Sequence, residues 1–161
     1  MKIKILIVIL IIIISSLTFA DFQSGNYYFK NNQYEKAREQ FLETSGDFNC
    51  IYGIAVTSRF LGDYDKAINN YNILIAKDPK FYEGYLGLGI CYQLKGNFDQ
   101  AILFFNKFLE IKKQENIFEI IANLYILQKK PNLAKNIIKE GLNYFPNSKA
   151  LKKLMIIVYD S

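Results

Sequence analysis

The sequence predicts an all-α protein in which antiparallel helix pairs follow one another along the chain. The first observation is a repeated spacing, because a small residue precedes a second small residue by twelve positions four times in succession. The second is that Gly and Pro fall mostly between the apolar segments, where helices must end. Single pairs cannot bury their apolar faces alone, so the predicted architecture is an α-solenoid of about nine stacked helices.

The four pairs of small residues mark the places where helices are expected to cross. The residues assigned to this repeat packing are Gly25, Ala37, Ala55, Ala67, Gly89, Ala101, Ala122 and Ala134. Antiparallel helices approach closely only where both carry a small side chain, so Gly89 is expected to face Ala101. Between them lies Gly96, which can take the left-handed conformation that ends a helix.

The helices and their boundaries follow from this pattern. Helices are expected at residues 21–31, 34–44, 47–61, 64–77, 80–95, 98–113, 115–128, 131–144 and 147–159. The first pair lies only 30 residues before the second, so the second helix should end at Ser45-Gly46-Asp47. Pro79 and Pro146 close the second and fourth pairs. In the fourth pair Lys129-Lys130-Pro131 replaces the glycine turn.

The third pair carries the most specific motif. Tyr85, Leu88, Gly89 and Tyr92 precede Ala101 and Phe105 with the spacing Y-x2-L-G-x2-Y and A-x3-F. This spacing closely resembles the tetratricopeptide repeat (TPR), a helix-turn-helix unit of about 34 residues. The resemblance covers residues 21 to 159 and implies a superhelix with a concave side. It implies a TPR domain at 21–161, with repeats near 21–46, 47–80, 81–113 and 114–147 and a terminal helix at 148–159.

Residues 1–20 have the composition of a secretory signal peptide. Two lysines precede an unbroken apolar run at residues 5–14, and the segment ends at Ala20. A spanning helix needs about 20 predominantly apolar residues, whereas three hydroxyl residues dilute this segment. We therefore expect cleavage after Ala20 and an exported, periplasmic or extracytoplasmic protein. The alternative is a membrane anchor formed by residues 3–20.

Composition argues against catalysis. The chain contains no His, which removes imidazole as a general base or zinc ligand. No carboxylate pair, phosphate-binding loop or nucleophile-base arrangement stands out, so we expect no enzyme, cofactor or metal. Cys50 and Cys91 are expected to be buried thiols, because their positions in the repeat differ by about 10 Å along parallel helices.

Charge and hydropathy single out the C-terminal part. Without residues 1–20 the net charge is +3, from 18 basic and 15 acidic residues, which is too small to indicate nucleic acid. A cluster of lysines comprises Lys129, Lys130, Lys135, Lys139, Lys149, Lys152 and Lys153. It fits a solvated outer face or a contact with anionic lipid or an acidic partner. One side of the last helix should pack on the helix at 131–144, leaving Ile156 and Tyr159 partly exposed for self-association or a partner.

The resemblance also implies a function. TPR arrays are protein-protein interaction modules that hold a partner or peptide on the concave side, lined by the first helix of each repeat. The residues implied there are Asn26, Phe29, Tyr52, Val56, Arg59, Leu86, Ile90, Gln93, Glu119 and Asn123, together with Phe22 and Ile126. They do not reproduce the Lys/Asn/Arg clamp by which some members hold a C-terminal carboxylate.

Two functions fit these residues. The first is a non-catalytic scaffold or adaptor of the cell envelope that binds a partner protein in the groove. The second is a chaperone or carrier for apolar peptide or lipid cargo, because Val56, Leu86 and Ile90 would form an apolar trough. The alternative for Tyr52, Leu86 and Ile90 is packing against neighbouring helices.

Overall fold

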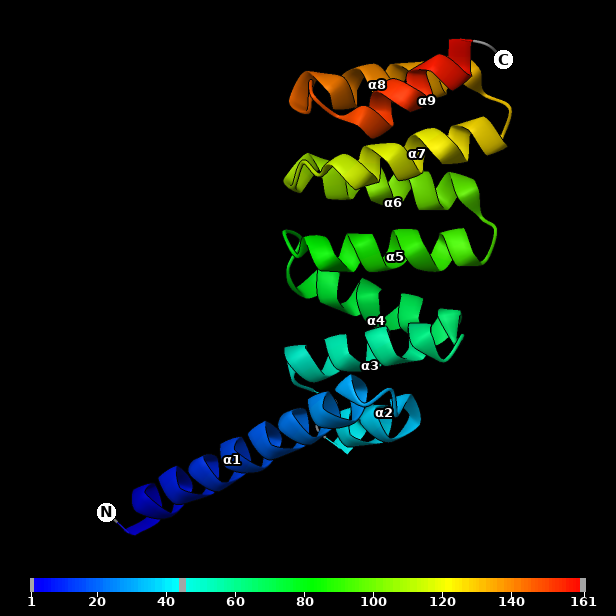
Figure 1. Ribbon diagram of the computed structural model, residues 1–161. Helices are drawn as coiled ribbons and strands as arrows, with labels where there is room; N and C mark the ends of the chain where they lie inside the picture. Colours follow the sequence, from blue (N-terminus) through cyan, green and yellow to red (C-terminus); the bar gives the residue numbers. More distant parts are fainter. Residues whose placement is uncertain (1, 44–45, 160–161) are drawn as a thin grey trace. The chain divides into compact units, whose positions relative to one another are not determined.

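The computed structural model describes residues 2–43 and 46–159, where all regular secondary structure is α-helical (Figure 1). The helices are α1 (Lys2–Lys30), α2 (Tyr34–Glu43), α3 (Phe48–Phe60), α4 (Tyr64–Lys77), α5 (Tyr82–Leu94), α6 (Phe98–Ile111), α7 (Glu115–Leu127), α8 (Pro131–Tyr144) and α9 (Lys149–Tyr159). The predicted all-α fold of consecutive helix pairs is confirmed. The chain divides into two compact units, Met1–Gly87 and Leu88–Ser161.

The largest difference from the predicted boundaries is at the start. The first helix was expected at residues 21–31, but α1 begins at Lys2 because no Gly or Pro interrupts the chain before Gly25. In α5 the first turn begins at Tyr82 rather than 80, because Asp78 accepts hydrogen bonds from the amides of Lys80 and Phe81 and holds a turn there. Within the described residues, no helix has both the length and the apolar character that a membrane crossing requires.

The core of the first unit is built around the ring of Phe41. This side chain projects from α2 and is 2% exposed. Gly25 of α1 and Gly53 of α3 both approach the ring so closely that a Cβ on either glycine would overlap it. Ala37, Cys50 and Ile54 complete the buried cluster around it. The two glycines therefore let three helices pack around one aromatic ring.

The same arrangement recurs at the end of the first unit. Tyr71 of α4 is 2% exposed, and its ring lies where a side chain on Gly87 would be. The turn between α3 and α4 contains Gly62 with φ +79°, a left-handed conformation that suits glycine. In the preceding turn Asn32 adopts φ +57°. Asn is one of the few other residue types that enter this region readily.

In the second unit the ring of Phe105 fills the space next to Gly89. A Cβ at residue 89 would lie 2.5 Å from the ring of Phe105. Ala101, which was expected to face Gly89, is buried, but the aromatic ring one turn further along α6 is the nearest group. The space that glycine leaves on α5 is thus filled by the larger ring. Gly96 adopts φ +76°, as the turn requires.

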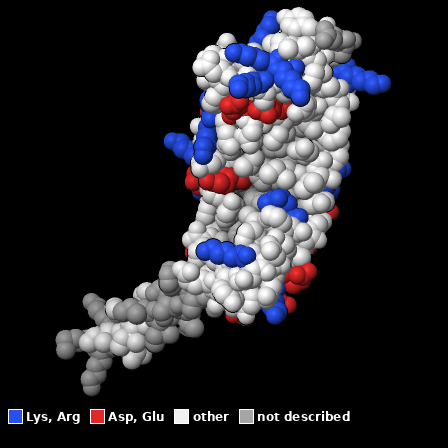
Figure 2. Space-filling model, viewed as in Figure 1, with Lys and Arg blue, Asp and Glu red and all other residues white. Residues whose placement is uncertain are grey.

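The second unit ends with α8 and α9, which pack against each other and against α7. Ser148 directly precedes α9, and its hydroxyl oxygen accepts a hydrogen bond from the amide of Leu151 at 3.0 Å. Leu151 and Val158 are buried, whereas Ile156 and Tyr159 are exposed, as the sequence predicted. Figure 2 shows lysine side chains gathered at this end of the unit. The turn before α8 places Lys129 at φ +56° in the position that glycine holds in other repeats.

Replacement of Gly53 by Ala should destabilise the first unit. The new methyl group would lie 2.6 Å from ring atoms of Phe41, and Gly25 on another side of the ring limits its retreat. We expect Gly53→Ala to lower the free energy of unfolding by about 1–3 kcal/mol. Thermal unfolding followed by circular dichroism measures this as a lower Tm.

Gly46→Ala is the matched control for this substitution. Among the described residues, no atom lies within 4 Å of a Cβ placed at residue 46, and its φ is not positive. Its Tm should equal or slightly exceed that of the wild type, because Ala restricts the unfolded chain. Equal Tm values for both variants would contradict the packing around Phe41.

Candidate functional site

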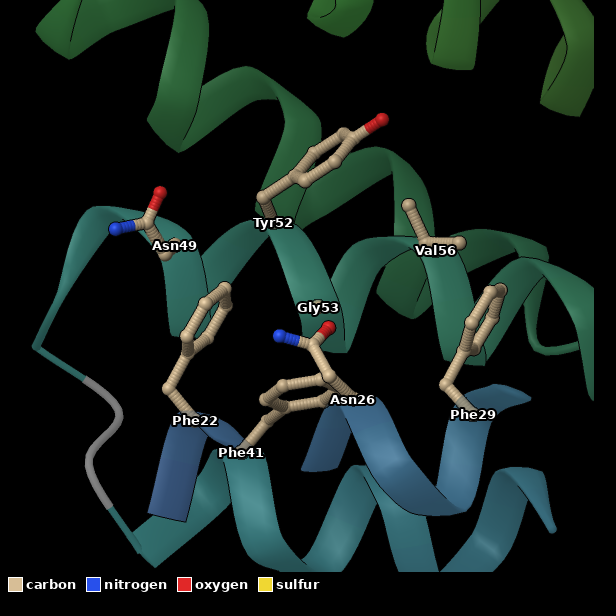
Figure 3. A pocket seen from close by; sticks show the side chains of 8 residues that line it. All are labelled: Phe22, Asn26, Phe29, Phe41, Asn49, Tyr52, Gly53 and Val56. Atoms are coloured by element: carbon tan, nitrogen blue, oxygen red, sulfur yellow. The ribbon is translucent and has the colours of Figure 1, made fainter. Parts of the chain in front are cut away.

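A pocket of about 240 Å³ opens between α1, α2 and α3 in the first unit (Figure 3). Its lining residues are Phe22, Asn26, Phe29, Phe41, Asn49, Tyr52, Gly53 and Val56. Five of these were placed on the concave side from the sequence, namely Phe22, Asn26, Phe29, Tyr52 and Val56. Most of the lining is aromatic or aliphatic, with two amide side chains as polar groups. The pocket can therefore bind an apolar group and hydrogen-bond a neighbouring polar group.

One wall of the pocket comes from α1. Phe22, Asn26 and Phe29 follow one another at intervals of four and three residues, so they share one face of the helix. In Figure 3 the two rings stand on either side of the Asn26 amide, which points into the space between them. Both rings are half-buried and pack against the core of the unit. The Asn26 amide can both donate and accept hydrogen bonds.

The opposite wall comes from α3, whose start is fixed by Asp47. The carboxylate of Asp47 accepts hydrogen bonds from the amides of Asn49 at 2.8 Å and Cys50 at 3.2 Å. This N-cap sets where the helix begins, and therefore which face presents Asn49, Tyr52 and Val56 to the pocket. Asn49 and Tyr52 are three positions apart and Tyr52 and Val56 are four apart, so the three residues share one face of the helix.

Tyr52 is held in place by other aromatic rings. Its ring meets Phe81 edge to face at 5.4 Å between centroids, and Tyr71 at 6.4 Å. Burial raises the pKa of its hydroxyl, and the nearby Glu83 carboxylate raises it further. The hydroxyl therefore remains a neutral hydrogen-bonding group at neutral pH. A rigid tyrosine with a neutral hydroxyl is suited to contact a partner.

Three lining residues were not predicted as part of a site. Phe41 is a core residue, 2% exposed, and it also forms the floor of the pocket. Gly53 leaves the floor open beside this ring, and Asn49 lies exposed at the start of α3. Glycine inside a helix costs about 1 kcal/mol relative to alanine. Its presence at residue 53, within a helical segment, was the available signal that another group packs closely there.

Arg59 lies one helical turn beyond Val56, and its guanidinium group is not neutralised. The group stacks on Phe60 at 4.5 Å from the ring centroid, and Phe60 in turn stacks on Tyr34 at 4.9 Å. The Nε atom is buried and has no hydrogen-bond partner. No described carboxylate forms an ion pair with Arg59. Because Arg59 as a whole is partly exposed and keeps its charge, the accessible nitrogens of its guanidinium group can receive an anion.

The remaining predicted residues are distributed over both units. Leu86 is half-buried on the part of α5 that belongs to the first unit, while Ile90 and Gln93 are half-buried on the part that belongs to the second. On α7, Glu119 is half-buried and Asn123 is exposed. Burial and the neighbouring Glu115 raise the pKa of the Glu119 carboxyl. The described residues include no cluster of three or more potential metal ligands.

Comparison with known sequences identifies the repeat. The family model described as "Tetratricopeptide repeat" matches residues 52–116. The small glutamine-rich tetratricopeptide repeat-containing protein 2 of Saccharomyces cerevisiae is 29% identical over 123 residues, which cover 74% of this chain and 34% of the yeast protein. The TPR repeat-containing protein MJ1428 of Methanocaldococcus jannaschii is 33% identical over 113 residues, which cover 63% of this chain and 20% of that protein. The chain thus spans about a third and a fifth of these two relatives.

Solved structures show the same fold. MamA superimposes with a TM-score of 0.78 at 12% identity, covering 91% of this chain and 82% of MamA. YrrB, described as a TPR protein with an unusual peptide-binding site, gives a TM-score of 0.71 at 17% identity, covering 86% of this chain and 74% of YrrB. Residues 52–116 therefore match the tetratricopeptide repeat, and the chain shares the fold of solved tetratricopeptide repeat proteins. The tetratricopeptide repeat is typical of protein-protein interaction scaffolds, which are typically not enzymes.

The raised pKa of Glu119 predicts a dependence of stability on pH. Because the folded pKa lies above the unfolded value of 4.5, the stability present below that value is lost as the pH rises through the folded pKa. Glu119→Gln avoids this loss and the repulsion from Glu115. Its Tm should therefore exceed that of the wild type by more at pH 7 than at pH 4, although partial exposure keeps the effect small. An equal difference at both pH values would contradict the assignment.

Proposed function

We propose that this protein is a non-catalytic adaptor that binds a segment of a partner protein in the α1–α3 pocket. The observation that carries the proposal is the convergence of Phe22, Phe29, Tyr52 and Val56 around one cavity with Asn26 inside it. An apolar side chain of the partner enters the pocket. The Asn26 amide then hydrogen-bonds the partner's backbone, which offers both donors and acceptors.

The size of the pocket favours a peptide side chain over lipid cargo. Sites for small molecules usually measure about 300–1,000 Å³, and the volume here is about 240 Å³. One aliphatic or aromatic side chain fits such a volume, whereas a long acyl chain would leave most of its surface in water. The adaptor therefore agrees better with this pocket than the lipid carrier does. A carrier of apolar peptides remains the second candidate, because it would use the same contacts.

Arg59 adds a charge preference to the pocket. The Cα atom of Arg59 lies about 4.5 Å further along the axis of α3 than that of Val56, from the rise of the helix. A partner with an acidic side chain near its apolar anchor would supply the anion that Arg59 lacks. We therefore propose a partner segment in which an acidic residue lies close to an apolar one.

We also propose that residues 1–20 direct the protein out of the cytoplasm and are then removed, with a membrane anchor as the alternative. The apolar side chains at residues 5–11 are exposed on α1, from 48% at Ile9 to 72% at Leu6. An export machinery or a lipid phase would cover such a run. Removal after Ala20 would keep every pocket residue of α1, since the first of them is Phe22.

Val56→Phe tests the pocket directly. The larger ring should fill part of the cavity, keep the fold and exclude the partner's side chain. We expect at least a tenfold loss of the co-purified protein when tagged variants are recovered from envelope extract and analysed by mass spectrometry of proteins and lipids. The wild type should recover one or two defined proteins.

Ile73→Phe provides the matched control. Ile73 belongs to the same unit, is 45% exposed on α4 and does not line the pocket. It should capture as much partner as the wild type, and all three proteins should have similar Tm values. Equal capture by Val56→Phe would rule out the pocket, and recovery of heterogeneous apolar peptides or lipids would replace the adaptor with the carrier.

The location is tested by the N-terminal sequence of the protein recovered from cells. We expect the mature chain to begin at Asp21 and to occur in the extracytoplasmic fraction, because the apolar run is short. Recovery of chains that retain Met1 in the membrane pellet would establish the anchor instead.

A further inference from the structure

The end of the second unit presents an exposed surface that has no part in the pocket. We call it the C-terminal patch. Its apolar centre consists of Ile156, Ile157 and Tyr159 of α9, which are 63%, 43% and 61% exposed. The lysines around it are Lys152 and Lys153 of α9 and Lys135 and Lys139 of α8.

The packing of α9 explains why these side chains point outward. Leu151 and Val158 are buried seven residues apart, so they lie on one face of the helix against α7 and α8. Lys152 and Lys153 project from the opposite face of α9, about one turn before Ile156 and Ile157. The exposed face therefore passes from basic to apolar along its length.

The two helices meet at Tyr159. The ammonium group of Lys135 lies 3.7 Å from the centroid of the Tyr159 ring. A hydrogen bond from Lys135 and the charge of Lys139 lower the pKa of the Tyr159 hydroxyl. Cations from α8 thus border the apolar residues of α9. Residues 129–159 contain seven lysines and a single carboxylate, that of Glu140. One of these lysines, Lys130, pairs with Asp99 of α6 at 3.3 Å and does not belong to the patch.

We propose that the C-terminal patch docks on the surface of an anionic lipid bilayer. Ile156 and Ile157 enter the boundary between headgroups and acyl chains, and the ring of Tyr159 lies at the headgroup level, where tyrosine is enriched. The lysines extend their stems over the apolar surface and place their ammonium groups among the lipid phosphates. The apolar and basic groups thus bind the same surface together.

Charge argues against a second copy of this chain as the occupant. A symmetric contact through the patch would bring Lys135, Lys139, Lys152 and Lys153 of each chain against the same lysines of the other. Like charges placed together in an interface are costly. An anionic bilayer supplies the opposite charge over the whole area, together with an apolar layer for the isoleucines.

The test is a fluorescent label placed at the patch of the full chain. Ile156→Cys is labelled with an environment-sensitive fluorophore, and Cys50 and Cys91 are 0% exposed, which directs the label to residue 156. Vesicles of phosphatidylcholine and phosphatidylglycerol should raise the fluorescence several-fold, and phosphatidylcholine alone should not. The local readout remains valid if residues 1–20 also insert. A label at Glu110→Cys, exposed on α6, should not respond.

Matched lysine variants make the test specific. Each lysine near an anionic surface strengthens binding about fivefold, so Lys152→Gln with Lys153→Gln should increase the lipid concentration at half signal about 25-fold. Lys112→Gln with Lys113→Gln removes the same charge from another exposed pair of the unit. This double variant should leave the lipid concentration at half signal nearly unchanged. The proposal fails if both pairs shift the curve equally or if the response does not require phosphatidylglycerol. It also fails if light scattering shows a dimer that Ile156→Lys dissociates, which would identify a second copy.

Discussion

Packing of an aromatic ring against glycine is the interaction on which each unit depends. Phe41, Tyr71 and Phe105 all project from the second helix of a pair onto a glycine of a first helix. The backbone of that first helix can then approach the ring without an intervening side chain. Because a glycine inside a helix is itself unfavourable by about 1 kcal/mol, the ring contacts must outweigh this cost. The fourth pair departs from the arrangement, with Ile138 in place of the ring and Gly141 next to Leu151 and Phe118.

The pocket is a consequence of the same packing. A side chain at residue 53 would overlap the ring of Phe41, so α3 can approach this ring closely only with glycine there. The same glycine leaves one edge of the ring open to the cavity. The floor of the candidate binding site is thus a core side chain. A ligand that contacts it would stabilise the first unit as well, since binding to the folded state raises its stability by mass action. Thermal shift is therefore a sensitive readout for partner peptides.

The helix pairs were predictable from sequence because their spacing is local. Small residues twelve apart mark each helix pair, and Gly96 marks the turn of the third pair, where its φ is +76°. The start of α1 was not predictable in this way, since the apolar run at residues 5–14 reads as a leader and as a helix alike. The face carrying Asn26, Phe29, Tyr52 and Val56 followed from the repeat register. The part that Phe41 and Gly53 play in the pocket could not be predicted from the repeat register. It depends on the crossing of α2 and α3 and not on the pattern of either helix.

The continuity of α1 makes processing of the N-terminus relevant to the shape of the pocket. In the intact chain Phe22 lies deep within a long helix, whose amides before it are hydrogen-bonded along the chain. A cut after Ala20 would place Phe22 in the first turn, where the amides have no intrahelical partners and helices fray. Asp21 would then be the first residue, of a type that compensates the positive helix end. Proteolytic removal of residues 1–20 would thereby loosen the α1 wall of the pocket at Phe22, while Asn26 and Phe29 would remain in stable helix.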